Sequence, residues 1–180
     1  YRMMTSRSEY RLLHRQDNAD IRLSHIGLRI GLVSPERHQA VLYKYALVER
    51  EIKRLENTHI TPTEKLNAFL TAHGTAAAVS GVSLADLIRR PQLGYEMLAD
   101  FDPERPGLPH AVCAQAEISL KYEGYIKRQL KQVEEFSRLE KRMLPEDIDY
   151  DRVTGLRLEA REKLKKIRPR SFGQASRISG

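Results

Sequence analysis

The side chains best suited to chemistry in this sequence are positively charged, and they gather at its two ends. Residues 1–29 hold six arginines against three acidic residues, and residues 161–180 hold seven basic residues against Glu162 alone. Residues 30–160 hold 18 basic and 20 acidic residues, so the excess charge lies at the ends. Two concentrated basic segments favour binding to a polyanion, because each neutralised phosphate releases condensed counterions. A solvated helix face is the alternative for either cluster taken alone.

In the first basic cluster Arg7, Arg11 and Arg15 are spaced by four residues, and Arg22 follows seven residues later. On a helix this spacing projects the guanidinium groups from one face, where each planar group can donate two hydrogen bonds to a phosphate. Internal pairing with Asp17 or Asp20 is the alternative, and we expect it for about half of these arginines. The candidate polyanion ligands here are Arg7, Arg11, Arg15 and Arg22.

The second basic cluster surrounds a turn at Pro169, beside free hydroxyl groups and the start of a helix. Helix N-terminal amides combined with lysine and arginine side chains form an anion site. The candidate ligands in this segment are Lys163, Lys165, Lys166, Arg168, Arg170 and Arg177.

A complete catalytic centre is not recognisable in the sequence. The six histidines are scattered without the spacing of metal ligands, and Cys113 lies among alanines and a valine, which is typical of a buried hydrophobe. The pair Gly27 and Gly31 lacks the lysine of a phosphate-binding loop, so it predicts close packing or a helix cap. No apolar run reaches the ~20 residues that span a bilayer. An unpaired cysteine fits a reducing cytoplasm.

Helix signals are frequent and strand signals are nearly absent, so we predict an all-α fold. A capping box at Ser6 and Glu9 predicts a helix that continues over residues 10–14. A second helix is expected over 21–30. A Ser-Pro pair then begins a long amphipathic helix over 34–57, with an apolar seam that is typical of coiled-coil packing.

The remaining helices define three expected regions. Shorter helices begin near Thr61 and Ser83, a linker covers residues 100–109, and the longest helix covers 110–144. We therefore expect long antiparallel helices in a bundle followed by a small helical C-terminal subdomain. The expected regions are 1–100, a linker and long helix at 101–144, and a basic subdomain at 145–180 that is truncated at its C-terminus.

Four stretches of the sequence resemble one protein family. They are the opening YRMMTSRSEYRLLHRQDNADIRL, the central KYEGYI, the segment LPEDIDYDRVTGL and the closing GLRLEAREKLKKIRPRSFGQASRISG. All four occur in this order in the tRNA uridine 5-carboxymethylaminomethyl modification enzymes, flavoproteins also called glucose-inhibited division protein A. Residues 57–112 match this family only loosely. The chain resembles the family's C-terminal helical region.

The resemblance implies that the chemistry belongs to another part of the protein. Enzymes of this family bind FAD in an N-terminal dinucleotide-binding domain and use NADH and a methylene-folate donor. With a GTPase partner they build an aminomethyl-type group on C5 of the wobble uridine of certain tRNAs. The flavin domain would precede Tyr1, so we expect this region to hold no cofactor and to be non-catalytic alone. The implied partners are tRNA, the GTPase and a second copy of the full-length enzyme, in the cytoplasm.

Three functions compete for this region. The first is a tRNA-binding arm, in which the two basic clusters contact RNA phosphates. The second is a protein-interaction scaffold whose long helices dock the GTPase with little direct RNA contact. A helix-turn-helix protein that binds duplex DNA is a distant third.

Overall fold

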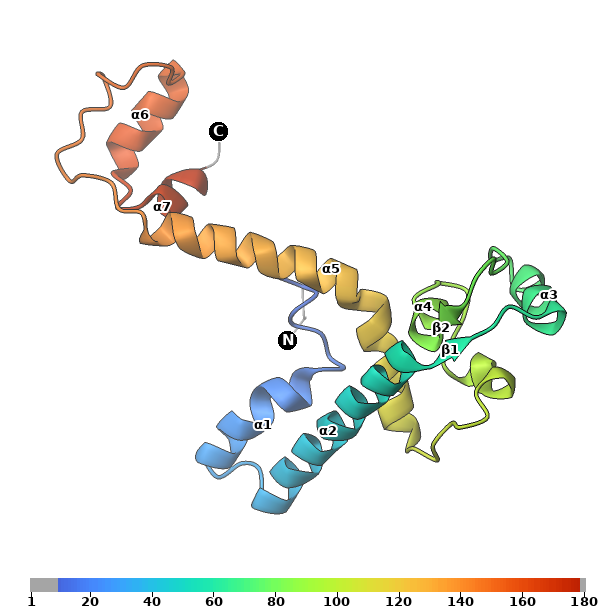
Figure 1. Ribbon diagram of the computed structural model, residues 1–180. Helices are drawn as coiled ribbons and strands as arrows, with labels where there is room; N and C mark the ends of the chain where they lie inside the picture. The colour runs from blue at the N-terminus through green and yellow to red at the C-terminus, as the bar shows by residue number, and fades with distance from the viewer. Residues whose placement is uncertain (1–9, 179–180) are drawn as a thin grey trace. The chain divides into compact units, whose positions relative to one another are not determined.

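The computed structural model describes residues 10–178 and forms two compact units, residues 1–126 and residues 127–180 (Figure 1). Unit 1 contains α1 (Ala19–Arg29), α2 (Pro35–Asn57), β1 (His59–Ile60), α3 (Glu64–Ala72), β2 (Val82–Ser83), α4 (Leu84–Ile88), the 3-10 helix η2 (Glu96–Phe101) and the first part of α5 (His110–Lys141). Unit 2 contains the rest of α5, α6 (Leu158–Ile167) and α7 (Phe172–Ser176). Among the described residues no helix is long and apolar enough to cross a membrane.

The all-α prediction is confirmed, with one small addition. β1 and β2 pair antiparallel, with His59 opposite Ser83 and Ile60 opposite Val82. A strand of two residues is too short to show alternating hydrophobicity, so no sequence pattern predicted it. The units divide between Ile126 and Lys127, inside α5. The regions expected from sequence have boundaries at residues 100 and 144, which were placed at the linker and at the end of the long helix. These boundaries stay a prediction.

The helix predicted over residues 10–14 is wrong, because this segment forms turns. The polar residues that follow explain the difference. The Asn18 side chain donates to the Leu13 carbonyl oxygen at 3.2 Å, and Arg15 donates to the Leu12 carbonyl oxygen at 2.6 Å. Short polar side chains that bond nearby backbone compete with helix formation. Ser6 and Glu9, the expected capping box, lie outside the described residues.

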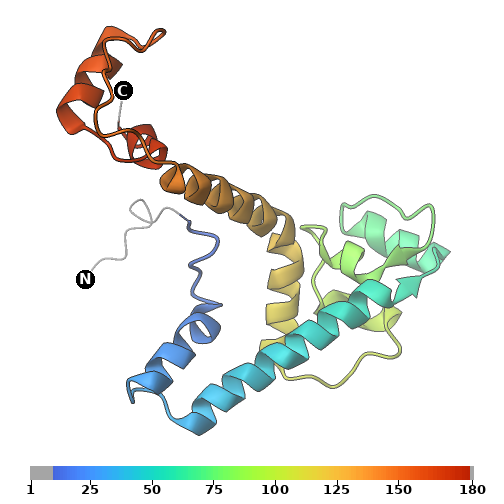
Figure 2. The same cartoon turned by 60° about the vertical axis from the view of Figure 1, so that its left-hand side comes forward.

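α1 and α2 form an antiparallel pair whose ends are set by local sequence (Figure 2). Gly31 ends the first helix with a φ of +77°, a conformation that favours glycine. Ser34 begins the second by accepting a hydrogen bond from the Arg37 amide at 3.3 Å, with Pro35 at the first helical position. A Cβ at Gly27 would lie 2.5 Å from Val33 Cγ2, so this glycine permits close packing, as predicted.

The core of unit 1 lies where α2, α3, α4 and the first part of α5 meet. Its fully buried side chains are mostly leucines, and Cys113 is also buried, as the sequence predicts. Of the predicted apolar seam on α2, Val48 and Leu55 are buried. The largest fully buried side chains of this core are Leu55, Leu66, Leu70, Leu84, Leu87, Ile88, Leu93 and Leu98. Burial of apolar surface on this scale is the main force that holds these short elements together.

Unit 2 is closed by backbone contacts that join the end of α5 to the start of α7. Met143 and Ser171 form an isolated antiparallel bridge, and the Leu144 amide donates to the Arg170 carbonyl oxygen at 2.9 Å. Ser171 caps α7 by accepting from the Gln174 amide at 3.1 Å. This bridge places the segment after α5 against the turn that connects α6 and α7.

Candidate nucleic-acid interface

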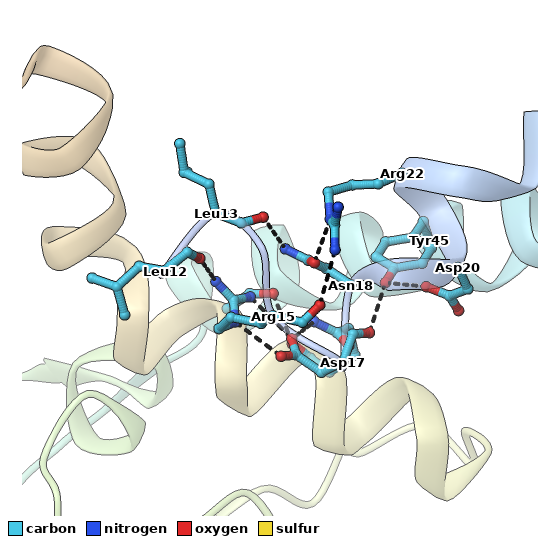
Figure 3. A network of polar contacts seen from close by, with 10 residues as sticks. Leu12, Leu13, Arg15, Asp17, Asn18, Asp20, Arg22 and Tyr45 are labelled. Atoms are coloured by element: carbon cyan, nitrogen blue, oxygen red, sulfur yellow. Dashed lines mark hydrogen bonds and ion pairs between the residues drawn. The ribbon is translucent and has the colours of Figure 1, made fainter. Parts of the chain in front are cut away.

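The amino-terminal arginines do not form the ridge that their spacing predicts. Residues 10–17 are not helical, so the expected alignment of guanidinium groups on one helix face is wrong. Arg7 lies outside the described residues. Arg11 is exposed and forms no ion pair within residues 10–178. Arg15 and Arg22 lie in an internal polar network, which Figure 3 shows.

Arg15 is held by Asp17, by the Tyr122 ring and by the Leu12 carbonyl oxygen. Its Nε and Nη2 donate to the two carboxylate oxygens of Asp17 at 2.9 and 3.0 Å, and its guanidinium carbon lies 5.4 Å from the centre of the Tyr122 ring. The side chain is only 15% exposed. The internal pairing considered for this arginine is therefore present, and the guanidinium is largely withdrawn from solvent.

Arg22 is also turned inward, toward the loop that precedes α1. Its Nε donates to Asn18 Oδ1 at 2.8 Å and its Nη2 donates to the Arg15 carbonyl oxygen at 3.2 Å. His14 Nδ1 lies 3.4 Å from Arg22 Nη1. These contacts hold the turns at residues 10–18 against α1, so the main role of Arg22 is structural.

Acidic residues at the start of α1 tie this network to α2 and α5. Tyr45 donates to Asp20 Oδ1 at 2.8 Å, and Gln115 donates to Asp17 Oδ2 at 3.2 Å. Burial alone would raise the pKa of Asp20, but hydrogen bonds from Lys44 and Tyr45 outweigh it and hold the pKa below its ordinary value. Burial, followed by the hydrogen bond to Asp20, raises the pKa of Tyr45. The network is thus a structural junction of three helices.

Unit 2 carries most of the chain's net positive charge. It holds 15 basic and 9 acidic residues, a net charge of +6, whereas unit 1 holds 16 basic and 15 acidic residues, a net charge of +1. Such an imbalance in 54 residues gives unit 2 a positive potential that attracts polyanions. Unit 1 as a whole is nearly neutral.

Three of the basic residues predicted in unit 2 already have acidic partners. Lys163 Nζ lies 2.7 Å from Glu159 Oε1, and Lys165 pairs with Asp151. Arg177 pairs with Glu140 and lies over the Phe136 ring, with its guanidinium carbon 5.2 Å from the ring centre. Exposed ion pairs of this kind are weak, so the lysines can exchange partners with a phosphate at little cost.

The other three predicted residues of unit 2 differ in this respect. Lys166, Arg168 and Arg170 are exposed and form no ion pair with any acidic residue in the described part of the chain. They lie at the end of α6 and in the turn that follows. Arg168 has a φ of +49°, which makes it the one described residue other than glycine with a positive φ. Together they form a cationic turn, defined here as residues 166–170.

The cationic turn borders a cavity that sequence reasoning missed. The cavity has a volume of about 370 Å³, and we name it the Tyr150 cavity. It is lined by Met143, Leu144, Pro145, Glu146, Ile148, Tyr150, Arg168, Pro169 and Arg170. Its walls come from two segments more than 15 residues apart, brought together by the bridge between Met143 and Ser171. The motifs LPEDIDYDRVTGL and GLRLEAREKLKKIRPRSFGQASRISG contain most of the lining residues, but neither indicates that the two segments meet.

A metal site is not formed in the part of the chain that the structure describes. No group of three histidine, cysteine or acidic residues lies close enough together among residues 10–178 to hold a metal ion. The groups available for recognition are therefore cationic side chains, backbone amides and the cavity walls.

Two family models match consecutive parts of the chain. Residues 35–130 match the C-terminal helical domain of the tRNA-modifying enzyme MnmG/GidA, and residues 132–180 match the C-terminal helical bundle of the same enzyme. The junction between the two matches, near residue 131, lies close to the division between unit 1 and unit 2.

Individual relatives agree over the full chain. It is 54% identical to the tRNA uridine 5-carboxymethylaminomethyl modification enzyme MnmG of Caldicellulosiruptor saccharolyticus and 53% identical to that of Clostridium kluyveri, covering 100% of this chain and 29% of each relative. The crystal structure of Aquifex aeolicus GidA (form II) aligns over 100% of this chain and 28% of that one, with 38% identity and a TM-score of 0.64. The chain thus spans less than a third of the relatives it matches. Its two matched domains and these relatives place it in the MnmG/GidA family of tRNA-modifying enzymes, as part of the family's C-terminal helical region.

Proposed function

We propose that this chain is the tRNA-binding region of an enzyme that modifies the wobble uridine. The observation that carries the proposal is the cationic turn, where Lys166, Arg168 and Arg170 are exposed and unpaired among the described residues. Unit 2, which contains this turn, has a net charge of +6. Phosphate contacts of this kind position an RNA without reading its sequence. The relatives' names, which describe tRNA modification, support tRNA as the polyanion.

The rest of the proposed activity belongs to the full-length protein. There, FAD and NADH would supply the redox chemistry that adds a carboxymethylaminomethyl or aminomethyl group at C5 of the uridine. The sequence of this chain offers no glycine-rich loop between a strand and a helix, so we assign the flavin to another part of the protein. A GTPase subunit and a second copy of the enzyme are the proposed protein partners, and the cytoplasm is the proposed location.

The role of the cationic turn can be tested by the salt dependence of tRNA binding. The 180-residue chain would be titrated with tRNA at several KCl concentrations, beside a variant that carries Lys166→Ala, Arg168→Gly and Arg170→Ala. Losing three phosphate contacts should reduce the slope of log K against log salt by about 2 to 3 and weaken binding at least tenfold at low salt. A matched control removes three exposed arginines of unit 1, namely Arg29, Arg37 and Arg50.

The control separates specific placement from total charge. Both variants lose three positive charges, so a general attraction between a basic protein and RNA would weaken equally in both. We expect the unit 1 variant to keep most of the salt slope. An equal loss in the two variants, or an unchanged slope in the first, would rule out the cationic turn as the tRNA contact.

A protein-interaction scaffold is the second candidate, and an exposed apolar face in unit 1 favours it. On α1 and the loop that follows it, the side chains of Leu23, Ile30 and Leu32 are 52%, 60% and 81% exposed. They border a cavity of about 400 Å³ that Val41 of α2 also lines. Contiguous exposed apolar patches mark sites of protein–protein or membrane interaction.

The two candidates predict opposite responses to one variant. Leu23→Glu combined with Leu32→Glu should abolish capture of the GTPase subunit if the apolar face docks it. The same variant should leave the affinity for tRNA within about twofold, because neither residue belongs to the cationic turn. Retained capture of the GTPase by this variant, with a folded chain confirmed by circular dichroism, would remove the apolar face as its docking site.

A further inference from the structure

The Tyr150 cavity has the size and lining of a site for one small ligand. Its volume of about 370 Å³ lies near the lower end of the ~300–1,000 Å³ typical of small-molecule pockets. Such a space exceeds what a bare phosphate needs. Its walls combine apolar side chains with groups of both charges, so a fitting ligand has an anionic end and an apolar, hydrogen-bonding body.

The anionic end of that ligand is indicated by Arg168 and Arg170. Both arginines line the cavity, and neither forms an ion pair with any described residue. Planar guanidinium groups favour phosphate, because two parallel N–H groups can bond two oxygens of the same anion. The left-handed backbone at Arg168, with φ at +49°, is a conformation that usually selects glycine. An arginine at such a position carries a backbone cost that glycine would avoid.

The body of the ligand is indicated by the other walls. Pro145, Ile148 and Pro169 give flat or compact apolar surfaces, and Glu146 adds a carboxylate that can accept N–H donors. One acidic group beside two arginines leaves a single excess positive charge, which matches one phosphodiester better than a cluster of phosphates. A nucleotide has these properties, because it combines one phosphate with a planar base that carries N–H groups.

Tyr150 supplies a separate observation. Its side chain lines the cavity, the residue is only 4% exposed, and its hydroxyl has no hydrogen-bond partner within the described residues. Buried tyrosine hydroxyls usually find a partner, because an unsatisfied polar group is costly. Tyr150 therefore brings a hydroxyl group that is unsatisfied in the free protein to the wall of the cavity.

We infer that the Tyr150 cavity binds a single unpaired nucleotide of an RNA, with its phosphate on Arg168 and Arg170 and its base against the proline and isoleucine walls. The inference rests on the proposed function, since it assigns a place to one nucleotide of the bound tRNA. The nucleotide must be unpaired, because a base that is stacked inside an RNA helix would have to be extruded before it could enter a cavity. The site would therefore recognise a loop, a bulge or an end of the RNA.

The test is a titration of the 180-residue chain with nucleoside 5′-monophosphates, monitored by amide chemical shifts in NMR. We expect one or more monophosphates to shift the amides of residues 143–150 and 168–170. Inorganic phosphate should bind at least tenfold more weakly, and the nucleoside without its phosphate should also bind more weakly. Equal affinity for inorganic phosphate and for every monophosphate would overturn the inference, because it would leave the base without a role.

Two substitutions place the ligand in the cavity. Arg168→Gly keeps the left-handed backbone, so the chain stays folded while the guanidinium is removed, and monophosphate affinity should fall at least tenfold. Tyr150→Phe should weaken binding severalfold without lowering thermal stability, since the hydroxyl has no partner in the free protein. Arg138→Ala removes the same charge from an exposed position in unit 2 and should leave affinity within about twofold. Unchanged binding by the Arg168 variant would refute the site.

Binding of intact tRNA to the same proteins separates this inference from the proposed function. If tRNA binds with a steep salt dependence but no monophosphate shifts the cavity amides, the nucleotide site is refuted and the tRNA-binding role stands. If tRNA fails to bind at any salt concentration, the proposed function fails and the inference fails with it.

Discussion

Arg54 lies between two buried carboxylates of unit 1, so its replacement by methionine should lower the free energy of unfolding strongly. Its guanidinium donates to both oxygens of Glu51, at 2.7 and 2.9 Å, and to both oxygens of Asp102, at 2.6 and 2.9 Å. The carboxylate side chains are only 3% and 4% exposed. Hydrogen bonds to Glu51 and then to Asp102 raise the pKa of Arg54, so the guanidinium stays charged at every accessible pH.

The expected magnitude follows from what the substitution leaves behind. Removing one partner of a buried ion pair costs about 3–5 kcal/mol, because the remaining charge is buried without compensation. The Arg54 side chain is itself 22% exposed, so water can reach part of the site, and we expect about 3 kcal/mol. For a unit of this size such a loss lowers the melting temperature by roughly 10–15 °C. Tyr95, which donates to Glu51 at 2.8 Å, offsets little of it.

Differential scanning calorimetry of the 180-residue chain would measure this effect against a neighbouring control. Lys53→Met removes the same charge from the adjacent position of α2. Lys53 pairs with Glu49 at 3.2 Å, but the two side chains are 69% and 71% exposed. Exposed pairs contribute only about 0–1 kcal/mol. If Arg54→Met and Lys53→Met lowered the melting temperature equally, the buried network would not be a major source of stability.

Two further predictions concern pH and backbone conformation. Burial would raise the pKa of Asp17, but hydrogen bonds from Arg15 and Gln115 hold it below its ordinary 3.8. Its ionised form therefore stabilises the fold above that pH, and the contribution is lost as the pH falls through the lower folded-state value, so Asp17→Asn should flatten the fall in urea midpoint between about pH 5 and pH 2. An equally steep fall in the variant would contradict this. Arg168→Gly should raise the free energy of unfolding by about 0.5–1 kcal/mol in thermal melts, whereas Arg138→Gly, in a right-handed helix, should lower it by up to ~1 kcal/mol; changes of the same sign would contradict the conformational explanation.

The elements that sequence predicted well are those whose boundaries depend on adjacent residues. Ser34 and Pro35 begin α2 at the expected place, and Ser83 caps α4 by accepting from the Asp86 amide at 3.0 Å. The failure at residues 10–14 has the opposite cause. The turn there depends on Arg15 and Asn18 bonding to backbone carbonyls, a competition that helix propensity does not describe.

For the candidate interface, the sequence predicted where the positive charge lies. It did not predict which of the basic side chains are free of acidic partners and available to contact a phosphate. The pair Lys163 and Glu159, four residues apart on α6, can be anticipated from helical spacing. Arg177 and Glu140 are 37 residues apart, and their pairing requires the folded unit 2. The Tyr150 cavity is likewise invisible to local pattern, because it forms only where separated segments meet.

Because Cys113 is buried, the rate at which the chain's single thiol reacts measures the opening of unit 1. Residues 127–180 contain no cysteine, so a thiol reagent reports on the first unit alone. The side chain is 4% exposed within the core, and it can react only when that core opens. The modification rate at low reagent concentration would give the free energy of opening, and its limit at high concentration would give the opening rate. Both could be followed while RNA is bound, with no label introduced into the chain.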